Sequence, residues 1–124
     1  DLRNTDEELL TRAEIRMADV VRKTAAREGV TVKERNLARF APVNFAPEMI
    51  DLVESTAKAL GHSVCRIPSG AGHDAQMFAP NCPTAMIFVP SKDGISHNIR
   101  EHTDAADIQA GANVLLQTIL HQAA

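Results

Sequence analysis

The sequence predicts an α/β protein: a lid-like α+β fragment over residues 1–43, joined to the closing part of an α/β catalytic domain over residues 44–124. Three observations support this prediction. Apolar residues recur at helical spacing in three long segments, short apolar runs lie between them, and glycine or proline marks most boundaries. We therefore expect helices and strands to alternate along the chain.

The first element is an amphipathic helix. Thr5 is placed to cap its start, and Glu8 three residues later completes a capping box. Gly29 is expected to end it. Residues 31–39 and Phe40 then alternate as a rather polar strand near a sheet edge. The apolar stripe of the helix comprises Leu10, Ala13, Met17, Val20, Val21 and Thr24.

A linker with two prolines separates this unit from the second half of the chain. Pro47 suits the first turn of a second helix, which Gly61 is expected to end. Residues 63–67 are predicted to form a short strand. Residues 84–89 form an apolar run without alternation, typical of a strand covered on both faces.

The last two predicted helices differ in length. Residues 74–78 predict a short helix stopped by Pro80. Thr103 is placed to cap a final helix, with Asp104 and Asp107 suited to its first turn. The final helix has a predicted buried face formed by Ile108, Ala112, Leu115, Leu116 and Ile119.

The composition of the chain argues against several classes of partner. The net charge of −3 and the absence of Trp and Tyr argue against a nucleic-acid partner. No apolar run is long enough to cross a bilayer, so no membrane partner is expected. Cys65 and Cys82 fit neither a disulfide framework nor a zinc motif, which favours a reduced, cytoplasmic setting. Because the chain starts at Asp1 without Met, we expect a piece of a larger protein.

Two glycine-rich loops each carry one histidine, on either side of residues 84–89. His97 follows Gly94 in one loop, where it is either a zinc ligand or a loop histidine bonded to backbone. In the other, Gly70 to Asp74 is either an anion or oxyanion pocket to which His73 adds a donor, or a plain turn with Asp74 as helix cap. Glu101 is placed to orient the loop carrying His97.

Arg3 also has two interpretations. It is either a bidentate clamp for a substrate carboxylate or an ordinary surface arginine. The residues alone leave this choice open.

Three segments together resemble a known family. They are residues 69–76 (SGAGHDAQ), residues 85–91 (AMIFVPS) and residues 94–98 (GISHN) with Glu101. They are similar to the closing segment of the zinc-dependent amidohydrolases of the M20 peptidase clan. The nearest branch contains the N-carbamoyl-L-amino acid hydrolases, allantoate amidohydrolases and β-ureidopropionases. The opening Asp1-Leu2-Arg3 resembles the end of a lid-domain strand in those enzymes.

The resemblance implies roles for individual residues. His97 matches the C-terminal metal ligand, and Arg3 matches the arginine that grips the substrate carboxylate. The residues themselves place Asp74 either to hold the His73 imidazole or to cap the short helix, and Glu101 either to cap or to orient the loop carrying His97. The remaining zinc ligands and the general-base glutamate would lie before residue 1, so the chain alone is expected to be inactive. The loop lining the substrate pocket corresponds to Gly70, Ala71, Gly72 and His73.

The resemblance also implies an activity. The full-length enzyme would hold two zinc ions, with Mn, Co or Ni as possible substitutes, and activated water would attack the carbamoyl or amide carbon of a small carboxylate-bearing N-carbamoyl or ureido substrate. The lid domain would form a homodimer. N-carbamoyl-L-amino acid hydrolysis is the leading hypothesis, and allantoate hydrolysis uses the same chemistry on a ureide. The alternative from another class is a non-catalytic dimerisation or peptide-binding module, because the unpaired layer of residues 1–39 would leave exposed sheet edges.

Overall fold

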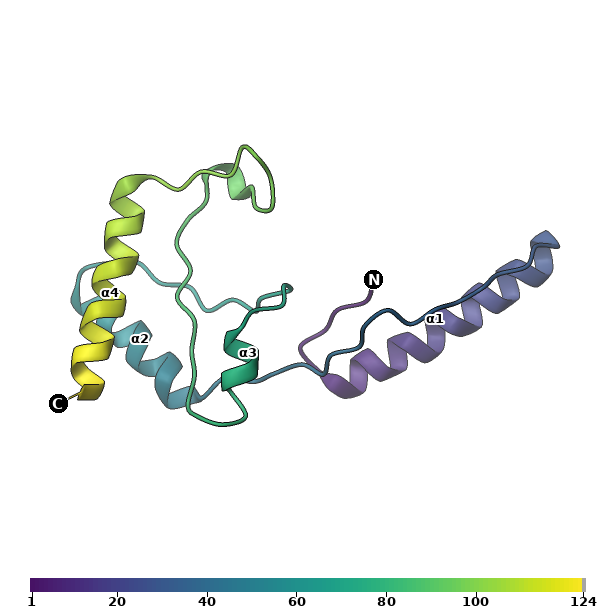
Figure 1. The fold of residues 1–124 in the computed structure, drawn as a ribbon, viewed down its shortest axis with the longest axis horizontal. Helices are drawn as coiled ribbons and strands as arrows, with labels where there is room; N and C mark the ends of the chain where they lie inside the picture. Colours follow the sequence, from purple (N-terminus) through teal and green to yellow (C-terminus); the bar gives the residue numbers. More distant parts are fainter. Residues whose placement is uncertain (124) are drawn as a thin grey trace. The chain divides into compact units, whose positions relative to one another are not determined.

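The computed structural model describes residues 1–123, in which the regular elements are helices (Figure 1). Four are α-helices, and η1 is a short 3₁₀ turn at Lys92–Gly94. The chain divides into two compact units. The first comprises residues 1–44 and 68–72, and the second comprises residues 45–67 and the described residues from His73 onward. The α-helices are α1 (Glu7–Glu28), α2 (Pro47–Ala59), α3 (Ala75–Phe78) and α4 (Ala105–Ala123).

The first unit is built on α1. Its N-cap is Asp6, whose side chain accepts a hydrogen bond from the Leu9 N–H at 2.8 Å, so the prediction that Thr5 caps this helix is wrong. A carboxylate at this position satisfies an otherwise unpaired N–H and complements the helix dipole. Gly29 ends α1 as predicted, in the left-handed conformation at φ 65°.

An ion-pair cluster fastens the chain after α1 back onto the helix. Arg39 donates to both carboxylate oxygens of Glu7, at 3.1 and 2.6 Å, and to Glu14 at 3.0 Å. Figure 1 shows residues 30–40 running back along α1. The hydrogen bond from Arg39 lowers the pKa of Glu7, and the bonds to Glu7 and then Glu14 raise the pKa of Arg39.

In the second unit, α2 packs against α4 (Figure 1). Pro47 begins α2 as predicted, and Gly61 follows its end at φ 84°. The buried residues here are Ala57 from α2, and Val114 and Thr118 from α4. The Thr118 hydroxyl donates to the Val114 carbonyl at 2.8 Å, which satisfies the buried polar group within the helix.

Residues 84–89 lie across α4 at a very close approach. A Cβ added to Gly111 would stand 2.5 Å from Cγ1 of Val89, so only glycine fits there without a shift. At the other end of this segment, the Ala46 N–H donates to the Thr84 carbonyl at 3.1 Å. These contacts place the apolar run between the start of α2 and the middle of α4.

The predicted strands at residues 31–40, 63–67 and 84–89 are not formed in the described chain, so the α/β assignment is corrected here to a helical structure. A strand exists through a ladder of backbone hydrogen bonds to a neighbouring strand. Among residues 1–123, these segments have no such partner. Apolar side chains of the first of these segments stay largely uncovered: Leu37 is 78% exposed and Phe40 70% exposed.

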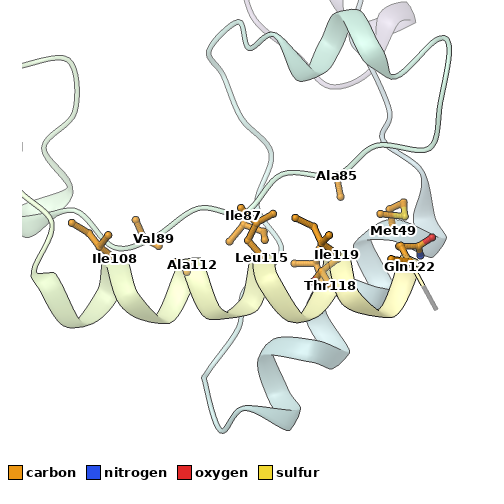
Figure 2. A pocket seen from close by; sticks show the side chains of 13 residues that line it. Met49, Ala85, Ile87, Val89, Ile108, Ala112, Leu115, Thr118, Ile119 and Gln122 are labelled. Atoms are coloured by element: carbon orange, nitrogen blue, oxygen red, sulfur yellow. The ribbon is translucent and has the colours of Figure 1, made fainter.

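An open apolar trough of about 740 Å³ lies between α2, residues 85–89 and α4 (Figure 2). Figure 2 shows Ile87, Leu115 and Ile119 together along its length. None of the helices among residues 1–123 combines the length and apolar character that crossing a bilayer requires.

The close approach at Gly111 predicts that Gly111→Ala destabilises the fold when Val89 is present and stabilises it when the Val89 side chain is shortened. Alanine improves intrinsic helix propensity by roughly 1 kcal/mol. However, its methyl group would strike Cγ1 of Val89, whose β-branched side chain is stiff, and overpacking typically costs about 1–3 kcal/mol. Gly111→Ala should therefore lower the free energy of unfolding by about 1 kcal/mol, measured by urea denaturation. In a Val89→Ala background the same change should stabilise. Stabilisation in both backgrounds would contradict the close packing.

The Arg39 cluster predicts an acid-dependent stability effect. Since the pKa of Glu7 is lowered in the folded state, its contribution is present above about pH 4.3, the ordinary pKa of a glutamate. That contribution is lost as the pH falls through the lowered folded-state value. Glu7→Gln should lower the urea midpoint at pH 7, and the difference from the parent should shrink on acidification. Glu8→Gln, on the same helix turn, is the matched control. An equal effect of both variants at every pH would exclude a specific role for the Arg39 contact.

Candidate functional site

The loop carrying His97 is tied closed by bonds within itself. The Lys92 N–H donates to the His102 carbonyl at 2.8 Å, and the Ser91 hydroxyl donates to the Ile95 carbonyl. Three residues of the loop have positive φ: Asp93 at 57°, Gly94 at 66° and His97 at 55°. For a histidine this left-handed conformation is uncommon and needs support from its surroundings.

Glu101 supplies that support. Its Oε2 accepts a hydrogen bond from the His97 backbone N–H at 2.8 Å. This bond uses the backbone N–H of His97 and does not involve its imidazole. This is the contact through which Glu101 would orient the loop carrying His97. His102, in the same loop, pairs through Nε2 with Asp104 at 3.2 Å.

The described side chains that could bind a metal ion do not form a complete metal site. Among residues 1–123, no group of three or more His, Cys, Asp or Glu side chains is gathered closely enough to hold a metal ion. A catalytic zinc takes three protein ligands. The described residues therefore do not fit a complete zinc site by themselves, and His97 would contribute one ligand to a site that other residues complete.

The loop carrying His73 leads directly into the short helix α3. The His73 N–H donates to Oε1 of Gln76 at 3.1 Å, so a glutamine from the first turn holds the loop end. Asp74 stands at the N-cap position in helical conformation and makes no side-chain cap bond, so the capping role considered for it is not realised. The His73 ring contacts the ring of Phe88 edge to face, with centroids 5.6 Å apart and planes at 69°.

Arg3 lies against the glycine-rich segment within the first unit. Its Nη1 donates to the Gly70 carbonyl, although the two residues are 67 positions apart. Gly70 leaves room for this: a Cβ there would stand 3.7 Å from Cδ of Arg3. The Nε and Nη2 atoms of Arg3 both donate to Oδ2 of Asp1, at 3.0 and 2.6 Å. This is the edge that would grip a carboxylate in the clamp interpretation.

Of the candidate residues, the structure joins Arg3 to Gly70 and His97 to Glu101. Within the glycine-rich segment itself, the Ala71 N–H donates to the Ser69 hydroxyl at 3.2 Å. Gln76 and Phe88 were not expected to contact the site. Gln76 belongs to the motif at residues 69–76 and carried no assigned role, whereas Phe88 was interpreted only as part of an apolar strand.

None of the groups with a shifted pKa among residues 1–123 belongs to either histidine loop. In the second unit, Arg66 pairs with Asp51 at 2.6 Å and also with Glu54, which pairs in turn with Lys58. Hydrogen bonds from Lys58 and Arg66 lower the pKa of Glu54, and hydrogen bonds to Asp51 and Glu54 raise the pKa of Arg66. These ion pairs hold Arg66 against α2. None of the pairs named here involves a residue of either histidine loop.

The chain matches known hydrolases over most of its length. It is 37% identical over 119 residues to an N-carbamoyl-L-amino-acid amidohydrolase of Paenarthrobacter aurescens, which covers 96% of this chain and 29% of that protein. It is 60% identical over 47 residues to an allantoate amidohydrolase of Escherichia coli, which covers 38% of this chain and 11% of that protein. The chain thus spans less than a third of the length of these relatives.

A solved structure has the same fold over the same extent. The crystal structure of an amidase of the hydantoinase/carbamoylase family from Burkholderia multivorans superposes with a TM-score of 0.90 at 39% identity. The match covers 96% of this chain and 29% of that one. The model of peptidase family M20/M25/M40 matches residues 6–121. The chain therefore belongs to the peptidase family M20/M25/M40.

Proposed function

We propose that this chain is the C-terminal portion of a metal-dependent hydrolase of linear amide C–N bonds, an N-carbamoyl-L-amino acid amidohydrolase. The observation that carries the proposal is the 37% identity over 96% of the chain to a protein of that name. It is supported by the arrangement of both loops, because each holds its histidine by local hydrogen bonds. Such support suits residues that must meet a substrate or metal in a fixed geometry.

We assign the two parts of the chain as the resemblance implies. Residues 1–43 would belong to a lid and dimerisation domain, and residues 44–124 would form the C-terminal part of the catalytic domain. The exposed apolar side chains of the first part, such as Leu37 and Phe40, support a homodimer interface there. The two free cysteines, Cys65 and Cys82, support a cytoplasmic setting.

The residues of this chain would act by binding and orienting. Arg3 would grip the substrate carboxylate through Nε and Nη2, exchanging the Asp1 carboxylate for it. Its bond to the Gly70 carbonyl would set the clamp against the pocket loop. His73 would donate a hydrogen bond to the oxygen of the carbonyl under attack, which gains negative charge in the transition state.

His97 would hold one metal ion, with its backbone fixed by Glu101. We propose zinc, two per full-length subunit, with Mn, Co or Ni able to replace it. When bound, zinc supplies Lewis-acid chemistry for the attack of water on the carbamoyl carbon. Residues outside this chain would supply the general base, so the chain alone would have no activity.

Allantoate is the second candidate substrate. The 60% identity to an allantoate amidohydrolase over 47 residues favours it specifically, since the longer match to the carbamoyl hydrolase is 37% identical. Both reactions cleave a linear C–N bond, and both substrates present a carboxylate to Arg3. Comparison of kcat/KM for N-carbamoyl-L-amino acids and for allantoate, with the full-length protein, decides between them. Absence of both activities would contradict the proposed function.

The metal role of His97 predicts coupled losses. His97→Ala in the full-length protein should lower bound zinc from two to one per subunit and reduce kcat/KM by about 100-fold or more, because a missing ligand leaves the site incomplete. Metal analysis and hydrolysis of an N-carbamoyl-L-amino acid measure the two effects. His121→Ala, at the end of α4, is the control and should change neither. Unchanged zinc content in His97→Ala would remove His97 from the metal site.

The clamp role of Arg3 predicts a separation of binding from chemistry. Arg3→Ala should raise KM about 10- to 100-fold, the range expected for losing a bidentate charged hydrogen bond, with a smaller effect on kcat. Arg3→Lys should fall in between because lysine keeps the charge and loses the fork. Arg12→Ala on α1 controls for loss of an arginine. If KM for Arg3→Ala equals that of the parent, the clamp assignment is wrong.

A further inference from the structure

Gln76 and Phe88 contact His73 at two different points. The side chain of Gln76 accepts from its backbone N–H at 3.1 Å, and this fixes where the residue sits. Phe88 contacts its ring at 5.6 Å between centroids, with the planes 69° apart. A backbone bond leaves the side-chain torsions free, so the direction of the imidazole depends on what touches the ring.

The geometry of the ring contact is directional. An aromatic ring has a negative face and a positive edge, and rings at this separation prefer the edge-to-face arrangement. Rotation of the His73 ring out of this arrangement loses that attraction. A leucine of similar size would fill the same space without preferring any orientation of the imidazole. The contact therefore orients the ring in addition to occupying volume.

Phe88 belongs to a segment that is itself fixed. Its neighbour Val89 lies against Gly111 of α4 at close range, so the backbone carrying Phe88 cannot easily move away. The Phe88 ring therefore meets His73 from a segment that is held in place.

We propose that Phe88 is a positioning residue that fixes the direction of the His73 imidazole in the substrate pocket. This inference rests on the proposed function, because it assumes that His73 meets the substrate. Phe88 acts through His73 and does not touch the reacting atoms itself. The effect should appear as a loss of transition-state stabilisation that depends on the presence of His73.

The test is a double-mutant cycle in the full-length protein, with kcat and KM measured on an N-carbamoyl-L-amino acid. Phe88→Leu should lower kcat about fivefold, the scale of one edge-to-face contact, with less change in KM. Phe88→Tyr keeps the ring and should restore most of the rate. In a His73→Ala background, Phe88→Leu should have less than about a twofold effect. Phe78→Leu, an exposed phenylalanine on α3, is the matched control.

A second measurement separates failure of this inference from failure of the proposed function. The ring-proton NMR signals of His73, assigned by their loss in His73→Ala, should shift in Phe88→Leu and stay in place in Phe78→Leu. This readout does not depend on hydrolysis. Unmoved signals overturn the inference whatever the enzyme's activity. A rate loss that is equal in both His73 backgrounds, or that Phe88→Tyr does not rescue, also overturns it.

Discussion

The close approach of Val89 to Gly111 is the constraint that holds the segment between the two histidine loops of the sequence. It holds the apolar segment 84–89 on α4 at a distance that only a glycine allows. One residue before Val89, Phe88 meets the ring of His73. Two residues after it, Ser91 begins the loop of His97 and bonds to the Ile95 carbonyl. A single helix-to-segment approach therefore holds the segment that contacts His73 and that leads into the loop of His97. The same approach accounts for a glycine within α4 despite its low helix propensity.

Helices were predictable from the sequence because their determinants are local. Gly29 ends α1 and Pro47 begins α2 where the sequence indicates. The N-cap of α1 is Asp6, one residue later than predicted. Thr5 and Asp6 are both good N-cap residues, and the choice between them depends on the geometry of the chain that enters the helix. The strands failed for the opposite reason. Segments such as 84–89 have strand composition, but a strand needs a partner, and no residue pattern supplies one within the described chain.

The same division applies to the candidate site. The bond between Glu101 and His97 spans four residues, and the sequence had suggested only that Glu101 could orient this loop. The contact between Arg3 and Gly70 spans 67 residues, and only family resemblance suggested that both serve one pocket. Phe88 was missed entirely because an apolar run gives no sign of which side chain faces a neighbouring loop. Sequence reasoning thus anticipated a contact within one loop better than contacts between distant segments.

The mode of support in the two loops suggests how this part of an enzyme contributes to catalysis. Glu101 and Gln76 both bind backbone N–H groups of the histidines and leave the imidazoles for other contacts. The loops would therefore keep their shape before any metal or substrate binds. The conformational entropy lost in ordering them would then be part of folding and not of binding. Arg3 follows the same logic, since its Nη1 is anchored to a carbonyl while the opposite edge of the guanidinium holds a carboxylate. In Arg3, one set of atoms fixes position and another set binds a carboxylate. On the proposed function, this separation would let the chain present prepared binding groups to a site whose general base other residues would supply.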